Sequence, residues 1–175
     1  MGSTCEGEDD MGILAHLFKK EEIPQHADNE IVAVVNGEMI PADQIKDEVF
    51  AKEMIGHTIG FIPSDGDIVA PANGQLEVMY PTGHAFAVRM KDGCGLLVHI
   101  GIDTVNMKGN GFSILAKQGD TVRAGQPIVK VNLSKVKEAG YSDTVMLIVT
   151  EPAKDGSKVV YIDPVTVSKG QVINH

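Results

Sequence analysis

Tryptophan is absent from this sequence, and the other large aromatic residues are scarce, with five phenylalanines and three tyrosines. A core with so few aromatic rings must be filled mainly by aliphatic side chains. Cysteine occurs only twice, as Cys5 and Cys94, and Cys5 lies in a polar N-terminal stretch. We therefore expect no structural disulfide, which favours the reducing setting of the cytoplasm.

Basic residues are also in deficit, because 15 Lys and Arg face 24 Asp and Glu, which gives a formal net charge of -9. This excess of negative charge argues against a nucleic-acid partner, since contacts to phosphates dominate that kind of binding. It suits a basic protein partner, because opposite electrostatic fields speed encounter. No apolar run is long enough to span a bilayer, and no secretory signal pattern opens the sequence.

The sequence predicts a tail followed by one domain. Residues 1–28 are expected to form a flexible tail or linker, because residues 2–10 are polar and acidic. Within this tail Met11–Lys20 has apolar residues at helical spacing, which predicts a short amphipathic helix capable of weak contact with a membrane or a partner. A linker to an upstream domain is the other interpretation. Residues 29–175 are long enough for a single domain with its own core.

From Asn29 onward, short apolar runs rich in β-branched residues alternate with Gly and Pro. This pattern is typical of an all-β protein, and we predict an antiparallel β-sandwich or barrel-sandwich. Nothing in the sequence supplies the long helices of a parallel α/β sheet, although short helical turns are expected at 41–49 and 133–139. The predicted strands are Ile31–Val35, Ile68–Ala70, Gln75–Tyr80, Ala85–Met90, Gly95–Ile100, Pro127–Val131, Thr144–Thr150, Lys158–Ile162 and Gln171–Ile173.

An internal repeat supports this fold class. Residues 31–39 (IVAVVNGEM) and 68–76 (IVAPANGQL) are identical at five of nine positions, with an Asn-Gly pair at the same place. Asn-Gly favours a tight hairpin turn, because both residues tolerate positive φ. A third segment, residues 119–128, resembles the turn-and-strand unit of biotinyl and lipoyl carrier domains. The sequence therefore predicts a sandwich built from a duplicated hairpin unit.

Two of the six histidines lie in strand-like contexts. His99 stands between apolar residues of a predicted strand, so its ring and the side chain of Leu97 point to the same face. Gly101 follows closely and allows another backbone to approach. His84 begins a predicted strand after a turn, and the hydroxyl of Thr82 can hold a ring nitrogen or a phosphate oxygen. The plain alternatives are a hydrogen-bonded core histidine at His99 and a capped turn at His84.

Two histidines on neighbouring strands with a threonine nearby suit three kinds of chemistry. The first is phosphoryl transfer, in which one imidazole is the acceptor and the other stabilises the phosphoryl oxygens. The second is zinc binding by two histidines and an aspartate, although neither a cysteine pair nor a His-Glu-x-x-His pattern supports it. The third is acid–base hydrolysis, for which the sequence offers no positioned nucleophile.

The segment His99–Val105 (HIGIDTV), followed by Lys108–Phe112 (KGNGF), resembles the active-site motif of the glucose-type enzyme IIA domain of the bacterial phosphoenolpyruvate:sugar phosphotransferase system. Thr82–Phe86 resembles the segment that carries the second histidine of that family. Val69–Gly74 and Asp47–Phe50 also resemble family segments, in the same order along the chain. The resemblance covers about residues 30–175, and its most specific part is the segment that begins with His99.

This resemblance implies a phosphocarrier that accepts a phosphoryl group from phospho-HPr and donates it to a cysteine of a IIB domain. It implies that His99 is phosphorylated on Nε2, that His84 contacts the phosphoryl group and that Thr82 orients His84. Asp47 and Asp103 would form an acidic pair at the rim of the site. Partners would dock on an apolar collar, which we define as Val49, Phe50, Met54, Ile55, Tyr80, Leu97 and Val105.

The resemblance implies no required cofactor, although zinc could bind adventitiously or as a regulator at His84 and His99. The protein would be cytoplasmic and could associate with a membrane IICB permease, whose IIC domain selects the sugar. A biotinyl or lipoyl carrier is a poor alternative, because neither Asn-Gly pair has a lysine at the expected hairpin tip. Two alternatives stay open: a regulatory protein that binds partners according to its phosphorylation state, and a zinc-dependent hydrolase with His84, His99 and Asp103 as ligands.

Overall fold

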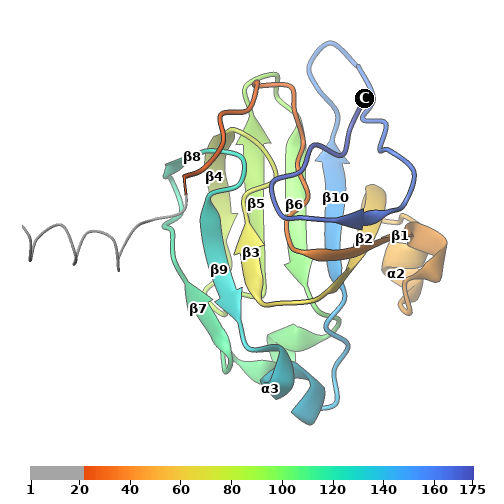
Figure 1. The fold of residues 1–175 in the computed structure, drawn as a ribbon, viewed down its shortest axis with the longest axis vertical. Coiled ribbons are helices and arrows are strands. Elements are labelled where there is room, and N and C mark those ends of the chain that lie inside the picture. The colour runs from red at the N-terminus through yellow and green to blue at the C-terminus, as the bar shows by residue number, and fades with distance from the viewer. Residues whose placement is uncertain (1–21) are drawn as a thin grey trace, which may run out of the picture.

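The computed structural model describes residues 22–175, which form a large and a small antiparallel sheet (Figure 1). The predicted amphipathic segment Met11–Lys20, and with it most of the predicted tail, lies outside the described residues. The rest of that tail contacts the domain, because the Ile23 and His26 carbonyls accept hydrogen bonds from the Arg123 and Asn73 side chains at 3.1 and 2.8 Å. Over residues 22–175, no helix has both the length and the apolar character needed to cross a bilayer.

Every strand pair is antiparallel. The larger sheet contains, in spatial order, β11 (Thr166–Val167), β1 (Gly37–Pro41), β2 (His57–Pro63), β10 (Val145–Glu151), β6 (Gly95–Ile100), β5 (Ala85–Met90), β4 (Gly74–Met79) and β8 (Thr121–Val122). The smaller sheet contains β3 (Asp67–Val69), β9 (Pro127–Val131) and β7 (Phe112–Ile114). The helical segments are short: the 3₁₀ turns η1 (Ala42–Gln44) and η2 (Thr104–Met107), and the helices α2 (Glu48–Ala51) and α3 (Leu133–Glu138). The predicted all-β antiparallel fold with short helical turns is confirmed.

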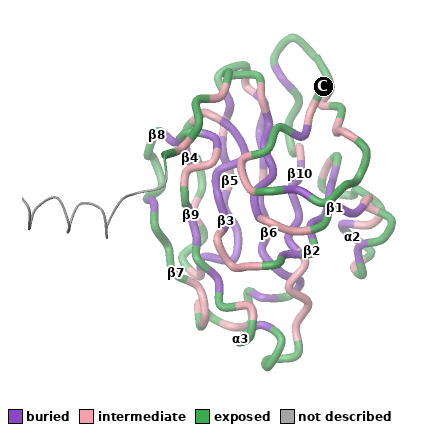
Figure 2. The backbone as a smooth tube through the Cα atoms, in the orientation of Figure 1, coloured by how far each residue is buried: buried purple, intermediate pink, exposed green. Residues whose placement is uncertain are grey.

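The buried residues follow the strands through the middle of the molecule (Figure 2). Side chains alternate along β6, so that Leu96, Val98 and Ile100 are at most 1% exposed while Leu97 and His99 are half-buried on the other face. The core is mainly aliphatic, as the composition predicts, because Phe61 and Phe86 are the only aromatic residues among the largest fully buried side chains of the described chain. The histidine of β6 therefore lies on the face that points away from this core.

The sequence repeat is also a structural repeat. Its two segments cross each other with matching hydrogen bonds, since Val32 N donates to Pro71 O and Val69 N donates to Val34 O, both at 2.8 Å. A second repeat, between 121–128 (TVRAGQPI) and 166–173 (TVSKGQVI), binds the first. Gly125 N donates to Ala70 O at 2.9 Å, and the equivalent Gly170 N donates to Ala33 O at 2.8 Å. The duplication therefore extends to the segments that begin with β8 and β11.

The Asn-Gly pairs do not form hairpin turns, contrary to the prediction. β3, which ends at Val69, and β4, which begins at Gly74, belong to different sheets. Asn73 connects chain segments through its side chain, which donates to the His26 carbonyl at 2.8 Å and accepts from the Ala124 N–H at 2.9 Å. Asn36 accepts from the Lys169 N–H at 2.7 Å in the equivalent position. Asn73 therefore links its own segment, 68–76, to segment 121–128. Asn36 links 31–39 to 166–173 in the same way.

Three predicted strands are not strands. Ile31–Val35 is buried at every residue but makes only the isolated bridge between Val32 and Val172, and 158–162 likewise contributes only a bridge at Tyr161. The third is 171–173, which contains Val172 of the first bridge. An apolar run that is buried on all sides looks like a strand in the sequence, because burial and strand pairing favour the same residues. Conversely, β1, β2, β7, β8 and β11 have no counterpart among the predicted strands.

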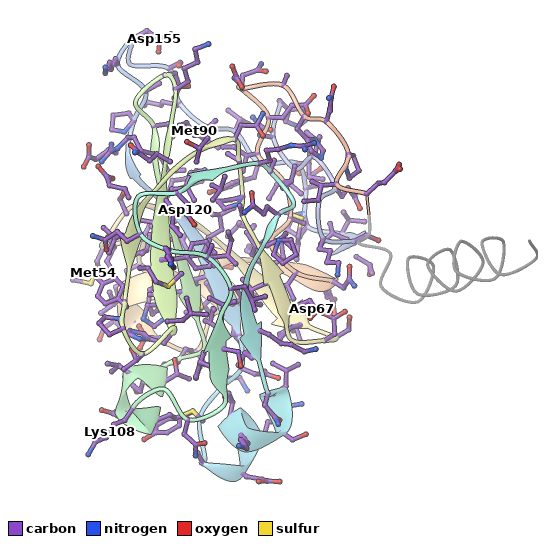
Figure 3. All side chains as sticks on the ribbon, turned by 90° about the vertical axis from the view of Figure 1, so that its left-hand side faces the viewer. Met54, Asp67, Met90, Lys108, Asp120 and Asp155 are labelled. Atoms are coloured by element: carbon purple, nitrogen blue, oxygen red, sulfur yellow. The ribbon has the colours of Figure 1, made fainter. Side chains whose placement is uncertain are left out.

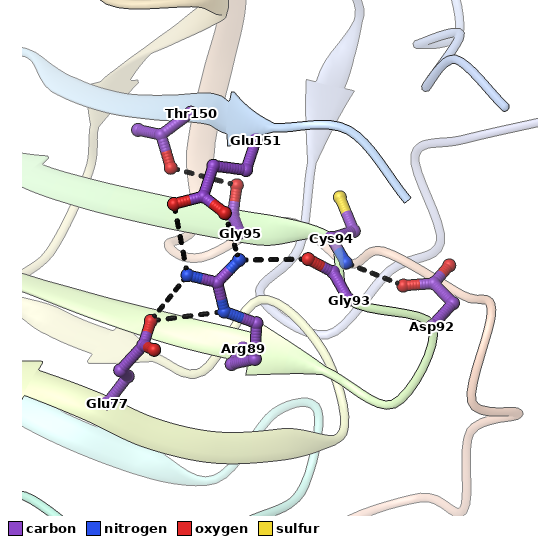
Figure 4. Close-up of polar contacts among 8 residues, drawn as sticks. All are labelled: Glu77, Arg89, Asp92, Gly93, Cys94, Gly95, Thr150 and Glu151. Atoms are coloured by element: carbon purple, nitrogen blue, oxygen red, sulfur yellow. Dashed lines mark hydrogen bonds and ion pairs between the residues drawn. The ribbon is translucent and has the colours of Figure 1, made fainter. Parts of the chain in front are cut away.

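An ion-pair cluster joins neighbouring strands at the end of β5 and β6 that lies away from the two histidines (Figure 4). Arg89 of β5 donates to Glu77 of β4 at 2.9 Å, to Glu151 of β10 at 2.7 Å and to the Gly93 carbonyl at 2.9 Å. Its guanidinium crosses β6 at Gly95, where a Cβ atom would lie 3.1 Å from the nearest guanidinium nitrogen. The cluster therefore joins β4, β5 and β10 across β6, on the same face as His99.

Candidate active site

The pairing of β5 with β6 brings His84 and His99 together. His99 lies opposite Ala85 in that ladder, and the Ile100 N–H donates to the His84 carbonyl at 2.7 Å. The two imidazole centroids are 5.3 Å apart and the rings are nearly perpendicular, at 79°. His84 is 6% exposed, whereas His99 is half-buried. The two histidines that the sequence singles out are therefore direct neighbours.

One hydrogen bond defines the tautomer of His99. Its Nδ1 lies 2.8 Å from the Gly101 carbonyl oxygen. A carbonyl oxygen only accepts hydrogen bonds, so Nδ1 carries the proton and Nε2 keeps the lone pair. The chain turns at Gly101 with a φ of +77°, a conformation that glycine adopts without strain. This turn brings the carbonyl of the second residue after His99 back to the imidazole ring.

The orientation of His84 depends on the turn before β5. Gly83 has a φ of +73°, and its N–H donates to the Tyr80 carbonyl at 2.8 Å. The same turn places Thr82 Oγ1 2.5 Å from His84 Nδ1. With the hydroxyl as the donor, Nδ1 is the acceptor and Nε2 carries the proton. His84 can then offer an N–H group to an anion, and the orienting role of Thr82 stays a prediction that this geometry supports.

Burial lowers the pKa of both imidazoles below the ordinary histidine value. For His84, the positive charge that His99 gains on protonation lowers the pKa further. For His99, the hydrogen bond to the Gly101 carbonyl and the negative charges of Asp47 and Asp103 oppose the effect of burial. Both rings are neutral at neutral pH, so His99 has a nucleophilic Nε2 lone pair available.

The two predicted acidic residues come from the starts of two short helices. Asp47 is the N-cap of α2, and its Oδ1 accepts from the Val49 and Phe50 N–H groups at 2.9 and 3.3 Å. Asp103 precedes η2 in a left-handed conformation with a φ of +61°. Both carboxylates influence the charge state of His99, which places them at the same site. Asp47 is half-buried and Asp103 is exposed.

Five of the seven predicted collar residues are exposed. Met54 is 68% exposed and projects from the surface in Figure 3. The Tyr80 ring centroid lies 5.3 Å from that of His84, so the collar reaches the second histidine directly. The exposed members, between 39% and 68%, are Val49, Met54, Ile55, Tyr80 and Val105.

The other two collar residues, Phe50 and Leu97, are not exposed. Phe50 is only 7% exposed, and its ring centroid lies 5.1 Å from that of His99. Leu97 is half-buried and packs against the apolar cluster that contains Phe50. Beneath them is a second apolar cluster that the sequence analysis missed, made of Phe50 with Ile40, Ile45, Ile102, Met146 and Ile148. The signal for a second packed face is the unbroken apolar run of β10, in which Met146 and Ile148 alternate with Val145 and Leu147 of the main core.

These observations can be compared with known proteins. A family model described as phosphoenolpyruvate-dependent sugar phosphotransferase system, EIIA 1, matches residues 29–155. The chain belongs to this family. The function class expected from the sequence, a phosphocarrier of a sugar phosphotransferase system, is thereby confirmed.

Individual relatives agree with the EIIA assignment. The chain is 37% identical over 155 residues to the glucose-specific EIIA component of Staphylococcus aureus strain COL, covering 89% of this chain and 92% of that protein. It is 34% identical over 153 residues to the glucose-specific EIICBA component of Staphylococcus carnosus, covering 81% of this chain and 23% of that protein. The structure of glucose permease IIA from Mycoplasma capricolum superposes with a TM-score of 0.77 at 34% identity, over 83% of this chain and 93% of that one. The chain spans only 19% to 23% of the length of this protein and of two other staphylococcal EIICBA components.

The positions of the side chains also bear on the alternative of a zinc-dependent hydrolase. Among residues 22–175, no group of three or more His, Cys, Asp or Glu side chains is placed to hold a metal ion. Catalytic zinc sites use three protein ligands and keep one position open. The three-ligand set of His84, His99 and Asp103 that the hydrolase alternative requires is therefore not assembled in this part of the chain.

Proposed function

We propose that this EIIA protein accepts a phosphoryl group from phospho-HPr on His99 Nε2 and passes it to a cysteine of a IIB domain. The observation that carries this proposal is the Nδ1–Gly101 hydrogen bond of 2.8 Å, which leaves the lone pair on Nε2 beside a second imidazole. In the first transfer the Nε2 lone pair forms a bond to phosphorus as the bond to the donor breaks. In the second, a cysteine thiolate takes the phosphoryl group and the electron pair returns to Nε2.

His84 and Thr82 stabilise the group in transit. The phosphoryl oxygens carry negative charge, and an Nε2–H of His84 donates a hydrogen bond to them. Thr82 keeps the His84 proton on that nitrogen by donating to Nδ1. Because His84 is buried and His99 is half-buried, these hydrogen bonds act in surroundings that are less polar than water, where they are stronger.

The rim selects partners that bring their own positive charge. Asp47 and Asp103 attract basic residues of a partner and repel an unaccompanied phosphate dianion. The exposed apolar collar docks on either partner without requiring matched hydrogen bonds, which suits a carrier that must meet two different proteins at one site. When a partner covers the collar, water is excluded from the phosphohistidine and hydrolysis is suppressed.

The names of the relatives support a narrower assignment. Those in Staphylococcus aureus and Staphylococcus carnosus are glucose-specific, and the second combines EIIA with IIB and IIC parts in one protein. We infer that this chain serves the uptake of glucose or a closely related sugar, in the cytoplasm beside a membrane permease with IIB and IIC domains. It needs no cofactor for this. Zinc bound to His84 and His99 would occupy both nitrogens used in transfer and would act as an inhibitor.

Phosphoryl labelling tests the proposal directly. The full chain is incubated with enzyme I, HPr and labelled phosphoenolpyruvate, and the label is then challenged with acid and with alkali. We expect a protein-bound label that is labile in acid and stable in alkali, as a phosphohistidine is, and its formation should require HPr. A hydrolase would stay unlabelled. Absence of label in the complete mixture would refute the carrier function.

The collar makes a separate prediction about docking. Met54→Gln replaces an exposed apolar side chain of the collar with a neutral polar one of similar length, which opposes contact with an apolar partner surface but touches neither imidazole. We expect about tenfold slower phosphoryl acceptance from phospho-HPr, the effect of losing one good interface contact. The matched control is Val172→Gln, since Val172 is 37% exposed and is bridged to Val32, whose N–H donates to the Pro71 carbonyl beside β3 of the smaller sheet. Equal rates in the two variants would show that the collar is not the docking surface.

A further inference from the structure

The turn that follows His99 is held by four hydrogen bonds on two peptide planes. In the plane between Ile100 and Gly101, the Gly101 N–H donates to the Thr144 carbonyl at 2.9 Å, and the Ile100 carbonyl accepts from Thr104 Oγ1 at 2.5 Å. In the plane between Gly101 and Ile102, the Ile102 N–H donates to the Ser142 carbonyl at 3.0 Å, and the Gly101 carbonyl accepts from His99 Nδ1 at 2.8 Å. Each peptide plane is thus fixed by one hydrogen bond at its N–H group and one at its carbonyl oxygen.

Three of these four partners are fixed by their places in the chain, because they are backbone carbonyls or the catalytic histidine itself. The exception is the Thr104 hydroxyl, which a different residue would not supply. Thr104 is 0% exposed, and its Oγ1 is satisfied by the Ile100 carbonyl. Its methyl carbon lies only 2.3 Å from the position that a Cβ atom would take on Gly101. Thr104 therefore packs against the turn with its methyl group and ties it with its hydroxyl.

We propose that Thr104 is the positioning residue that determines which nitrogen of His99 carries the proton. Without its hydroxyl, the buried Ile100 carbonyl loses its partner, which is costly, and the first peptide plane can rotate to find another. Rotation at Gly101 is cheap because glycine has no Cβ. The Gly101 carbonyl then moves away from Nδ1, and the tautomer with the proton on Nε2 becomes populated. That tautomer has no lone pair on Nε2.

This proposal deepens the phosphocarrier function and rests on it for its consequence, but the tautomer itself can be measured without any phosphoryl donor. The measurement is the pair of ¹⁵N chemical shifts of the His99 ring at pH 8, in wild type, Thr104→Val and Thr104→Ser. Val keeps the shape of Thr and removes the hydroxyl, whereas Ser keeps the hydroxyl and removes the methyl group. We expect wild type and Ser to show a protonated Nδ1, and Val to show shifts moved towards exchange between the two tautomers.

The matched control is Thr58→Val. Thr58 is also buried, at 3% exposed, and its hydroxyl also donates to a backbone carbonyl, that of Gly56, at 2.8 Å. It loses the same kind of hydrogen bond on β2, so we expect unchanged His99 shifts. In the labelling assay, Thr104→Val should accept the phosphoryl group on the order of 10- to 100-fold more slowly, as expected for a misplaced reacting group, and Ser should restore most of the rate.

A wild-type measurement covers the case in which Thr104→Val does not fold. The Thr104 hydroxyl proton, buried and bonded, should exchange slowly with solvent and show a dipolar contact to the backbone around Ile100. A fast-exchanging hydroxyl, or an unchanged tautomer in a folded Thr104→Val, would overturn the positioning role. If the carrier function were wrong instead, wild type would stay unlabelled while the tautomer results stayed as described, so the two failures are distinguishable.

Discussion

Replacing His99 with alanine is expected to abolish the acid-labile phosphoryl label completely. The physical reason is that the covalent bond to phosphorus forms at His99 Nε2, for which alanine has no substitute. The fold should survive, because His99 points away from the main core and is only half-buried. The measurement is labelling by enzyme I, HPr and phosphoenolpyruvate at saturating times, so that a merely slow variant would still become labelled.

His57 provides the matched control for this loss. It also lies on a strand of the large sheet. Its ring stacks on that of Tyr161, with 4.8 Å between the ring centroids, and its Nδ1 lies 2.8 Å from Glu53 Oε1. It is a histidine with an aromatic and an acidic neighbour, as His99 is, but it lacks a second imidazole beside it. His57→Ala should be labelled to the same extent as wild type. Label that persists in His99→Ala, or disappears in His57→Ala, would move the acceptor to another residue.

The fold class was predictable from the sequence, but the path of the chain was not. Gly and Pro between short apolar runs indicate an antiparallel sandwich, and strands such as β5 and β6 show clear alternation. β2 escaped prediction because Gly60 interrupts it. That glycine is required by packing, since a Cβ there would lie 2.8 Å from Ile40 Cγ1. Such long-range contacts leave no periodic trace in the sequence.

The residues of the candidate site that lie in short sequence motifs were predictable. The contacts that depend on the folded path of the backbone were not. His99, His84 and Thr82 stand out because of their neighbours in the chain, and the structure places them together. The hydrogen bond between His99 and the Gly101 carbonyl could not be foreseen, because it depends on a backbone turn. Similarly, the burial of Phe50 depends partly on Met146 and Ile148 of β10, which are far away in sequence. A sequence shows which side chains are available, but not which backbone groups face them.

Replacing His84 with alanine is expected to separate the two transfers. Acceptance from phospho-HPr should continue, because the Nε2 lone pair of His99 and the hydrogen bond from His99 Nδ1 to the Gly101 carbonyl are unaffected. Onward transfer to the IIB cysteine should fall on the order of 10²- to 10³-fold, the usual effect of removing one hydrogen-bond donor from a charge-stabilising site. The measurement is a chase: the labelled variant is isolated, mixed with a IIB domain, and the decay of label on His99 is followed against its appearance on the acceptor.

Thr82→Val tests whether His84 acts through the proton on its Nε2 atom. The variant keeps the His84 ring and its packing against Tyr80 but removes the hydroxyl that lies 2.5 Å from Nδ1. If His84 acts through a proton held on Nε2, the valine variant should transfer at a rate between those of wild type and His84→Ala, because the useful tautomer is then only partly populated. If His84 acts only by filling space, Thr82→Val should match wild type. A normal onward rate in His84→Ala itself would remove the second imidazole from the mechanism and leave His99 to transfer the group alone.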